Sequence, residues 1–551
     1  MAKTGLRLAR DEFDLSAPLA RTALAQSREV ESIIDATGGL GVALGIARPL
    51  DLSPAGSFAL AAPRLPSISG PPNPSFTDQV GFLNALNPNG SLDTDPNNSY
   101  WEFSGETARK WDTPTAGTSA TVKYFFDPSS GFSANEENTF LKAFGLWEAV
   151  ADITFVEANT VAQADVLLTR GNDGSAYFLG NTTNGSGSTL GSYVGQTLIS
   201  VDDSTFGFEL TGSFVTAGGY GLSTVIHEVG HMIGLGHGGF YNGAVNPATQ
   251  QYSAFDERQW TIMSYIYWNQ AGTAKFGDEY TVTGTNWGVT EDSINRQAPH
   301  TWMPVDILAA QWLYGESTSN ALNGGDTFGF NSNIGGIISD FFDFTVNDHP
   351  VITLFSLGTG NTLDASGFSE DAFIDLRPLG FSSLNGHVNN VVIADGTVIE
   401  TGIGGSGKDT IQGGDGKNKL LGKDGADQLL GGGGKDDLSG GAGKDKLEGE
   451  GGNDTFRLTS DKAADADKIV DFGGEDKVSL LGSEFGLAPG ALKASAFELG
   501  TAATSDKDRI IYDQASGKLW FDEDGTGAAA KVLIATFQNN AVLASTDFIV
   551  V

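Results

Sequence analysis

Three histidines and a glutamate stand close together in the sequence, in the order His227, Glu228, His231 and His237. On a helix, His227 and His231 would lie on the same face one turn apart, so their imidazoles could bind one Zn²⁺ ion. Gly234 tolerates the left-handed backbone that ends a helix, after which the chain could return His237 as a third ligand. Glu228 could then act on a water molecule in the open position of the metal. The pattern predicts a catalytic zinc site.

Met263 and Tyr265 follow these residues in the segment Ile262-Met263-Ser264-Tyr265. The spacing H-E-x-x-H-x-x-G-x-x-H followed by a methionine turn is the metzincin signature. We expect Met263 to form an apolar floor under the zinc ligands. The phenol of Tyr265 is expected near the metal, as a fifth ligand or as a donor to an oxyanion. The alternative, ordinary histidines on a buried helix, needs neither the glycine nor the third histidine.

The segments around these residues predict an α+β domain. Four segments have the apolar pattern of strands, namely 121–127, 153–156, 166–168 and 197–201. Ser133 and Glu136 fit a capping box for an amphipathic helix. The histidine helix is expected to have Ser223 or Thr224 near its N-cap. A last helix is expected over residues 305–315.

A second motif fills residues 404–457, which divide without a gap into six units of nine residues. The units follow the template G-G-x-G-x-D-x-U-x, where U is apolar, which is the calcium-binding repeat of RTX proteins. Glycines permit tight turns whose carbonyl groups point at an ion, and the sixth-position carboxylate adds hard oxygen. The eighth-position residues, expected to face inward, are Ile411, Leu420, Leu429, Leu438, Leu447 and Phe456. The alternative, a flexible glycine-rich linker, requires neither the period nor the apolar position.

Composition narrows the classes of function. The formal net charge of −36 argues against nucleic acid or an anionic membrane as partner, and suits a chain that folds on meeting a cation. The apolar stretch 38–47 is too short for a membrane span, which needs about 20 residues. The chain has no cysteine, so stability must come from a large core and bound metals.

The zinc motif, the methionine turn and the repeats together resemble the serralysin family of secreted bacterial zinc metallopeptidases, over roughly residues 75–551. Segments 329–332, 363–368 and 393–396 add to the resemblance. It implies an α+β metzincin-like zinc peptidase domain followed by an all-β parallel β-roll. It also implies His227, His231 and His237 as zinc ligands and Tyr265 as a switching phenol.

The same resemblance implies calcium ligands at the second, fourth and sixth positions of the repeats, with Glu400 ahead of them. The repeat positions are Gly405, Gly407, Asp409, Gly414, Gly416, Asn418, Lys423, Gly425, Asp427, Gly432, Gly434, Asp436, Gly441, Gly443, Asp445, Glu450, Gly452 and Asp454. Turns with Asn418, Lys423 or Glu450 are expected to bind calcium more weakly, because these residues depart from the template.

The chain departs from the family at four places, one of which is a leader longer than the short family propeptide. Gly238 and Gly239 stand where the family has proline after the third histidine, which should change the loop and not the metal. Segment 356–361 lacks both carboxylates of the family calcium turn, which argues against an ion there. Segment 275–300 is longer and more polar than expected, and is a candidate border of the cleft that alters substrate choice.

The chain is expected to divide into five segments. Residues 1–72 are a leader or propeptide with a proline-rich linker, for which plain disorder is the alternative. Residues 73–322 form the zinc peptidase domain, 323–403 a connecting β segment, 404–457 the calcium repeats, and 458–551 a C-terminal β region. The last five residues, one acid and four apolar residues, look like the family's type I secretion signal and equally like a final strand.

The predicted protein is a secreted extracellular endopeptidase, exported by the type I apparatus without a Sec signal. It would be a monomer that binds one catalytic zinc and several structural calcium ions and hydrolyses peptide bonds of proteins. Glu228 would act as general base and then as acid, on a substrate extended along an edge strand, for which 197–201 is the candidate. The alternatives are a calcium-dependent surface or adhesion protein on an inactive peptidase fold, and a processing protease of narrow specificity.

Overall fold

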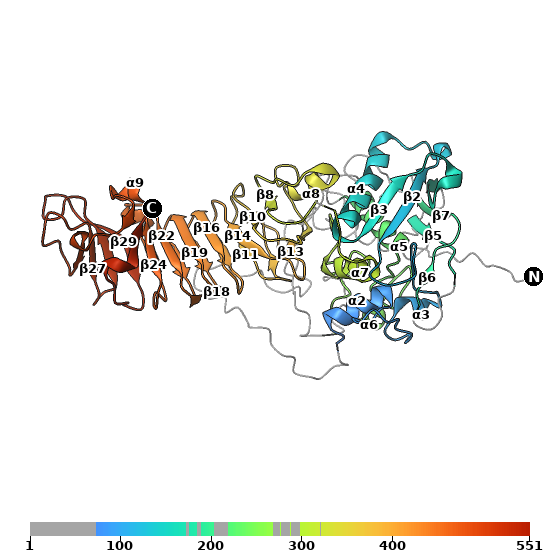
Figure 1. Cartoon of the computed structure of the whole chain (residues 1–551), viewed down its shortest axis with the longest axis horizontal. Helices are drawn as coiled ribbons and strands as arrows, with labels where there is room; N and C mark the ends of the chain where they lie inside the picture. The colour runs from blue at the N-terminus through green and yellow to red at the C-terminus, as the bar shows by residue number, and fades with distance from the viewer. Residues whose placement is uncertain are drawn as a thin grey trace, which may run out of the picture.

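The computed structural model describes residues 73–171, 176–183, 189–202, 219–267, 276, 287, 298–319 and 321–551. Two parts follow one another along the long axis of the molecule (Figure 1). The first is an α+β domain and the second is built of largely parallel strands, so the predicted fold class is confirmed. The predicted leader lies outside the described residues, as does most of segment 275–300.

A five-stranded sheet forms the framework of the α+β part, in the order β3-β2-β4-β7-β5. Its strands are β2 (Ala120–Phe126), β3 (Ile153–Glu157), β4 (Val166–Gly171), β5 (Ala176–Leu179) and β7 (Thr197–Asp202). β5 runs antiparallel to β7, and the other neighbours are parallel. The four strands expected from the sequence are therefore present.

The expectation that 197–201 is an edge strand is wrong. β7 lies between β4 and β5, and β5 forms the edge. Five of the six residues of β7 are buried, as expected for an interior strand covered on both faces. The residues of β5 alternate between buried and half-buried, which suits an edge.

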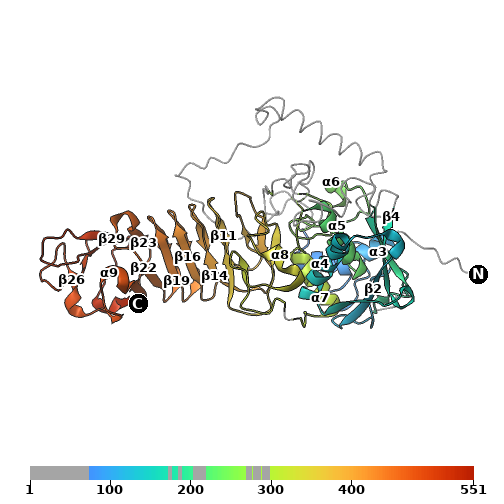
Figure 2. The same ribbon diagram turned by 90° about the horizontal axis from the view of Figure 1, so that it is seen from above.

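Helices cover this sheet. α4 (Ala134–Val150) begins with the expected capping box of Ser133 and Glu136. α5 (Tyr220–Met232) packs against α4, where Trp147 Nε1 donates to the Ile226 carbonyl at 3.2 Å (Figure 2). The other α-helices described in the α+β part are α2 (Phe76–Asn84), α3 (Tyr100–Ser104), α6 (Pro247–Gln250) and α7 (Pro304–Tyr314). α7 confirms the helix expected over 305–315.

The predicted start of α5 is wrong. Its N-cap is Gly219, and Ser223 and Thr224 lie inside the helix. Thr224 Oγ1 donates to the Tyr220 carbonyl at 2.8 Å, so its hydroxyl is bonded within the helix instead of capping it. Nearly every residue of α5 is buried, which places this helix in the centre of the domain.

Two nine-stranded sheets make up most of the second part (Figure 1). One contains, in spatial order, β25 (Gly490–Ala491), β30 (Phe548–Val550), β24 (Lys477–Leu480), β22 (Thr455–Leu458), β19 (Asp437–Ala442), β16 (Lys419–Asp424), β14 (Ile399–Ile403), β10 (Asn361–Asp364) and β8 (Thr327–Gly329). The other contains β11 (Phe373–Asp375), β15 (Thr410–Gln412), β17 (Gln428–Leu430), β20 (Lys446–Glu448), β23 (Asp467–Ile469), β29 (Val532–Phe537), β28 (Lys518–Phe521), β27 (Ile510–Asp513) and β26 (Phe497–Leu499).

Smaller elements complete this part. They are β9 (Ile352–Leu354), β12 (Phe381–Ser382), β13 (Val391–Ile393), β18 (Gly433–Gly434), β21 (Gly451–Gly452), α8 (Ser339–Phe342) and α9 (Gly482–Phe485), while β1 (Arg109–Lys110) and β6 (Gly191–Ser192) pair in the first part. In the described part of the chain, no helix has the length and apolar character needed to cross a bilayer.

Successive nine-residue units alternate between the two large sheets, so equivalent residues in one sheet are 18 apart. Leu420 pairs with Leu438 and Leu438 with Phe456 in one sheet, while Ile411 pairs with Leu429 in the other. All six eighth-position side chains have 0% exposure. The predicted inward-facing position is confirmed, and this apolar ladder fills the space between the sheets.

The last residues of the chain form β30, which runs parallel to β24. Phe548 and Val550 are buried, whereas Ile549 is 42% exposed. The expectation of a final strand is therefore confirmed, and alternate apolar residues of this segment lie in the core of the folded roll.

Candidate metal centre

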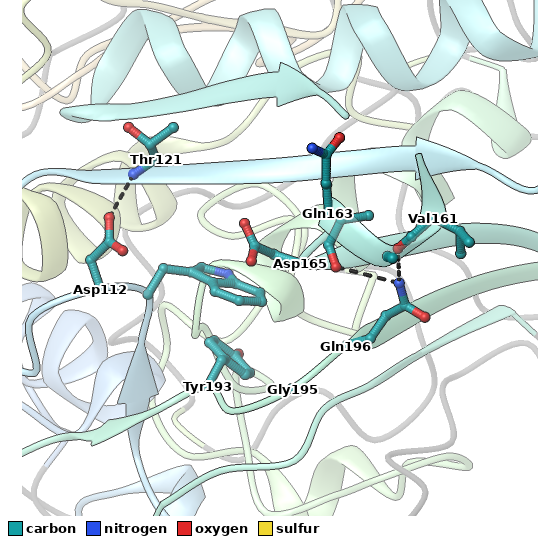
Figure 3. A pocket seen from close by; sticks show the side chains of 11 residues that line it. Asp112, Thr121, Val161, Gln163, Asp165, Tyr193, Gly195 and Gln196 are labelled. Carbon is teal, nitrogen blue, oxygen red and sulfur yellow. Dashed lines mark hydrogen bonds between the residues drawn. The ribbon is translucent and has the colours of Figure 1, made fainter. Parts of the chain in front are cut away.

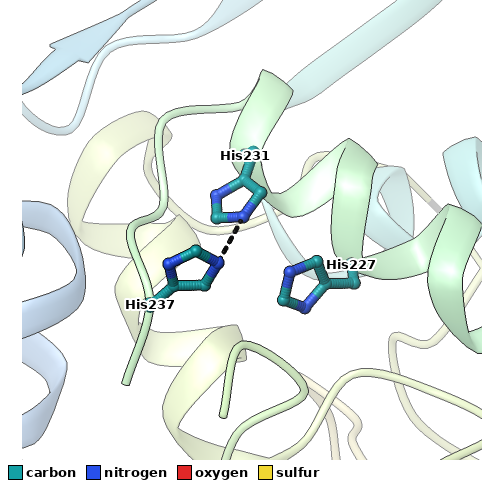
Figure 4. Close-up of side chains that lie close together, drawn as sticks. All are labelled: His227, His231 and His237. Atoms are coloured by element: carbon teal, nitrogen blue, oxygen red, sulfur yellow. Dashed lines mark hydrogen bonds between the residues drawn. The ribbon is translucent and has the colours of Figure 1, made fainter. Parts of the chain in front are cut away.

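Helix α5 brings His227, Glu228 and His231 into the interior of the α+β domain. The three histidines each offer a ring nitrogen, and these nitrogens lie within 4.8 Å of one another (Figure 4). His227, His231 and His237 are at most 3% exposed, and Glu228 is fully buried. The sequence prediction that these histidines gather is confirmed.

Gly234 allows His237 to return to the helix. Its φ of +107° is in the left-handed region, and a Cβ atom there would lie 2.2 Å from the Arg109 carbonyl oxygen. The Gly234 amide donates to the His231 carbonyl at 3.0 Å, which closes the end of the helix. His237 Nε2 then lies 3.1 Å from His231 Nε2 (Figure 4).

Backbone carbonyls set the orientation of two of the rings. Nδ1 of His227 lies 2.9 Å from the Ile262 oxygen, and Nδ1 of His231 lies 2.8 Å from the Leu235 oxygen. Because a carbonyl only accepts, these Nδ1 atoms carry the protons and each Nε2 carries a lone pair. His237 Nδ1 contacts the Tyr100 hydroxyl at 3.1 Å.

Convergent lone pairs repel one another unless a cation lies between them. With zinc–nitrogen bonds of about 2.0–2.1 Å, tetrahedral ligand atoms lie roughly 3.3 Å apart. The spacing of 3.1 Å between the Nε2 atoms of His231 and His237 is close to this value. The three-histidine cluster is therefore consistent with a zinc ion.

The methionine turn packs directly against α5. A Cβ atom at Gly230 would lie 2.6 Å from Met263 Sδ, so only glycine fits at this contact. Tyr265 projects from the same turn, and its hydroxyl lies 2.6 Å from His237 Nε2. Both side chains are at most 2% exposed. The structure thus brings all the sequence-predicted residues of this centre together.

Asp306, which sequence reasoning did not find, lies on α7 and holds the methionine turn. Its carboxylate accepts hydrogen bonds from the Ile262 amide at 2.7 Å and from the Thr261 hydroxyl at 2.5 Å. Burial raises the pKa of Asp306 to about 7, against the lowering effect of these hydrogen bonds. Asp306 also accepts from the Met303 amide at 2.8 Å at the start of α7, but the Thr261 and Ile262 partners are over forty residues away, so the local sequence does not reveal its contact with the methionine turn.

The end of α5 is also held by aromatic side chains. Tyr193 Oη donates to the His231 carbonyl at 3.0 Å, and Trp111 Nε1 donates to the Met232 carbonyl at 2.8 Å. The centroids of these two stacked rings are 4.4 Å apart, and both rings line a cavity of about 520 Å³. Asp112 and Asp165 line the same cavity (Figure 3). The cavity walls do not include the histidines, so we assign the reactive centre from the convergent ring nitrogens and not from this cavity.

A ladder of aspartates runs along the roll. The Asp427 carboxylate accepts from the Asp409 amide at 2.8 Å, the Asp445 carboxylate from the Asp427 amide at 2.8 Å, and the Asp454 carboxylate from the Asp436 amide at 2.9 Å. Burial, together with the charge of nearby carboxylates, raises the pKa of Asp427 to about 7. Burial likewise raises the pKa values of the other ladder aspartates.

Among the described residues, one oxygen of several ladder carboxylates finds no hydrogen-bond partner. These buried atoms are Oδ2 of Asp427, Asp436 and Asp445. Backbone carbonyls approach the same space, since a Cβ atom at Gly422 would lie 2.4 Å from Asp427 Oδ2 and 2.5 Å from the Gly440 oxygen. Buried oxygens that face one another fit a hard cation.

The ladder continues beyond the repeats. Asp467 accepts from the Asp445 amide at 3.2 Å, and Asp476 accepts from the Asp454 amide at 2.9 Å. These contacts span 22 residues, whereas the contacts within the repeats span 18. Because this connection is longer, neither aspartate fits the nine-residue template, although each is followed two residues later by an apolar residue.

Glu400 and Asn418 lie among backbone groups. The two Glu400 carboxylate oxygens accept from the Gly360 and Asn361 amides, each at 2.8 Å. The side-chain nitrogen Nδ2 of Asn361 donates to the carbonyls of Gly358 and Val398. A neutral donor thus lies between these two carbonyl oxygens, and the expectation that segment 356–361 lacks an ion stays a prediction. Asn418 Oδ1 accepts from the Gly414 amide at 2.8 Å.

The α+β fold with its three-histidine cluster is that of a matrixin-like domain. The Matrixin family model matches residues 111–259, and the model described as Peptidase M10 serralysin C terminal matches residues 319–550. A serralysin from Proteus mirabilis is 39% identical over 199 residues, which cover 35% of this chain and 35% of that protein. Metallopeptidase AprA from Pseudomonas marginalis is 33% identical over 308 residues, which cover 54% of this chain and 58% of that protein.

The chain thus spans between about a third and just over half of the length of these relatives. Both family models lie in the order expected for one protein, the catalytic type first and the C-terminal type second. The chain belongs to the serralysin family.

Proposed function

We propose that the chain is a zinc-dependent endopeptidase that hydrolyses peptide bonds of extracellular proteins. The observation that carries this proposal is the convergence of the three histidine nitrogens beside a buried glutamate on α5. His227, His231 and His237 would hold the zinc, with Tyr265 as a further ligand. When bound, zinc lowers the pKa of water and polarises a carbonyl group.

Glu228 would hold the proton during the reaction. As a buried carboxylate next to the first ligand, it would take a proton from the attacking water and deliver it to the leaving amine. The Tyr265 hydroxyl, 2.6 Å from His237 Nε2, would donate to the oxyanion once the phenol leaves the ligand position. Both groups come from rigid elements, α5 and the methionine turn held by Asp306.

The substrate would lie along β5. This strand is the edge of the five-stranded sheet and packs against α5, the helix that carries two of the three histidines. A peptide in extended conformation could pair with the outer backbone groups of β5 as an added strand. We propose β5 for this role in place of the strand expected from the sequence.

The roll would bind calcium through the sixth-position carboxylates and the second- and fourth-position carbonyls. The buried Oδ2 atoms of Asp427, Asp436 and Asp445, which have no hydrogen bond within the part of the chain that the structure describes, support this proposal. Calcium would neutralise stacked carboxylates that are costly to ionise when buried. The C-terminal strand β30 is part of this fold, so we propose that type I export of a monomer precedes folding in external calcium.

Metal removal and replacement test the proposed activity. Casein hydrolysis should stop after dialysis against a zinc chelator with calcium kept in excess, and one equivalent of zinc per chain should restore it. His237→Ala should retain its fold and lose zinc, as measured by atomic emission and circular dichroism. A folded wild-type protein that carries one zinc per chain and cuts no protein would contradict the proposal. It would favour an adhesion protein on an inactive fold.

A further inference from the structure

The Tyr241 side chain lies fully inside the domain, directly behind Tyr265. Its exposure is 1%, and its ring centroid is 5.0 Å from that of Tyr265 and 5.9 Å from that of His237. Tyr241 and Tyr265 belong to a small cluster of buried side chains separate from the main core. The sequence gives no reason to single out Tyr241, since no spacing connects it with the metal motif.

The Tyr241 hydroxyl makes two hydrogen bonds that connect Tyr265 with Asp256. It donates to Asp256 Oδ1 at 2.5 Å and accepts from the backbone amide of Tyr265 at 3.3 Å. The hydroxyl also lies 3.3 Å from Ser264 Oγ, on the residue before Tyr265. A phenol thus bonds directly to the backbone from which the Tyr265 side chain projects.

Asp256 is itself fixed in place. It has 0% exposure, and its second oxygen accepts from the Tyr252 amide at 3.2 Å. The chain after the third histidine packs on this carboxylate. Cβ atoms at Gly238 and Gly239 would lie 2.3 Å from Oδ1 and 2.2 Å from Oδ2 of Asp256.

The two glycines that follow His237 are therefore explained by this contact. Neither has the positive φ that would require glycine, so space alone demands it. Asp256 contacts the backbone next to a predicted zinc ligand on one side and, through Tyr241, the backbone of Tyr265 on the other. A displacement of this carboxylate would alter the relative position of the imidazole and the phenol.

We propose that Tyr241, held by Asp256, is a positioning residue that sets the distance between the Tyr265 phenol and the metal centre. This inference rests on the proposed zinc peptidase activity. Tyr241 does not touch the reacting atoms. Its hydroxyl holds the backbone amide of Tyr265, from which the Tyr265 side chain would move between the metal and the oxyanion. Without it the phenol would sample other positions, and the turnover number would fall while substrate binding stayed the same.

Tyr241→Phe tests the inference, with Tyr252→Phe as the matched control. Tyr252 comes from the same segment and stacks on Phe82 at 4.0 Å, and among the described residues its hydroxyl has no hydrogen bond. Tyr241→Phe should lower kcat about tenfold and leave KM within about twofold, as for the loss of one hydrogen-bonded positioning group. The Tyr252→Phe variant should retain the wild-type kcat.

A spectroscopic readout separates positioning from general destabilisation. Copper(II) accepts imidazole ligands, and a coordinated phenolate gives it an intense visible absorption band. The copper form of the wild type should show this band, and Tyr265→Phe should abolish it. Tyr241→Phe should weaken or shift the band at an unchanged copper content, and Tyr252→Phe should leave it unchanged.

The outcomes distinguish this inference from the proposed function. An inactive wild type with full zinc would overturn the proposed function. An active wild type whose Tyr241→Phe variant keeps both kcat and the copper band would overturn the positioning role alone. If Tyr241→Phe does not fold, Gly239→Ala applies the same test, because its Cβ would lie 2.2 Å from Asp256 Oδ2 and 2.6 Å from Tyr241 Cε1. Unchanged kcat and copper spectrum in that variant would likewise reject the proposal.

Discussion

The buried imidazole of His300 should make the protein less stable in mild acid. The side chain is 1% exposed, and burial lowers its pKa from 6.5 to about 3, with small contributions from His349 and His387 and an opposing hydrogen bond to Asn347. Because the folded pKa is lowered, the unfolded chain binds the proton more tightly. The stability that neutral His300 contributes is complete above pH 6.5 and is lost progressively as the pH falls toward 3.

The size of the effect follows from the two pKa values. At pH 5 the unfolded imidazole is almost fully protonated and the folded one is almost fully neutral. The free energy of unfolding should therefore fall by about 2 kcal/mol between pH 7.5 and pH 5 through this residue alone. In His300→Gln, which cannot take up the proton, this part of the pH dependence should vanish.

Urea unfolding of both proteins at pH 7.5 and pH 5, in saturating calcium and followed by tryptophan emission, measures the difference. The wild type should lose about 2 kcal/mol more than His300→Gln on acidification. Other groups titrate equally in both proteins and cancel in this comparison. An equal loss in the two proteins would show that His300 takes up its proton without unfolding, and would refute the reasoning.

Three further outcomes follow from the packing and charge of the described residues. In a calcium chelator, thermal melting of the roll should occur at a lower temperature at pH 8 than at pH 5. The reason is that the raised pKa values of about 7 for Asp427 and Asp436 favour the protonated form, whose contribution is lost as the pH rises through 7. Saturating calcium should abolish this dependence, and a melt that stays pH-dependent in calcium would argue against ion binding at these carboxylates. Leu438→Ala should lower the unfolding free energy of the roll by about 3 kcal/mol, because this side chain is fully buried between the sheets, and Leu438→Met should cost less than about 1.5 kcal/mol. Gly230→Ala should destabilise the peptidase domain by about 1–3 kcal/mol, since its Cβ would lie 2.6 Å from Met263 Sδ, and an unchanged melting temperature would contradict the close packing of the methionine turn.

The parts of the fold that sequence predicts well are those governed by a local period. The four-residue spacing of His227 and His231 fixes their common helix face, and Gly234 marks the end of that helix. The nine-residue period places Leu420 and Leu438 side by side, because each full turn of the roll contains two units. In both regions, local sequence and long-range packing impose the same requirement.

Contacts between distant segments are not visible in any local pattern. Strand order depends on pairing between segments that are separated in the chain, so an apolar run such as β7 does not reveal that β5 lies outside it. Asp306 binds the Ile262 amide and Asp256 binds the Tyr241 hydroxyl, and such contacts follow no period. Asp467 lies beyond an insertion that interrupts the repeat, and it joins the aspartate ladder only in the folded protein, through the Asp445 amide.

Casein hydrolysis by Glu228→Gln, compared with the wild type at equal zinc content, tests the central claim most directly. The amide has nearly the same shape as the carboxylate but cannot accept the proton, so the zinc ligands on α5 should remain in place. We predict that kcat/KM falls by about 10²–10⁴ while both proteins bind one zinc ion per chain. Full activity in the zinc-loaded variant would show that Glu228 is not the general base and would contradict the proposed mechanism.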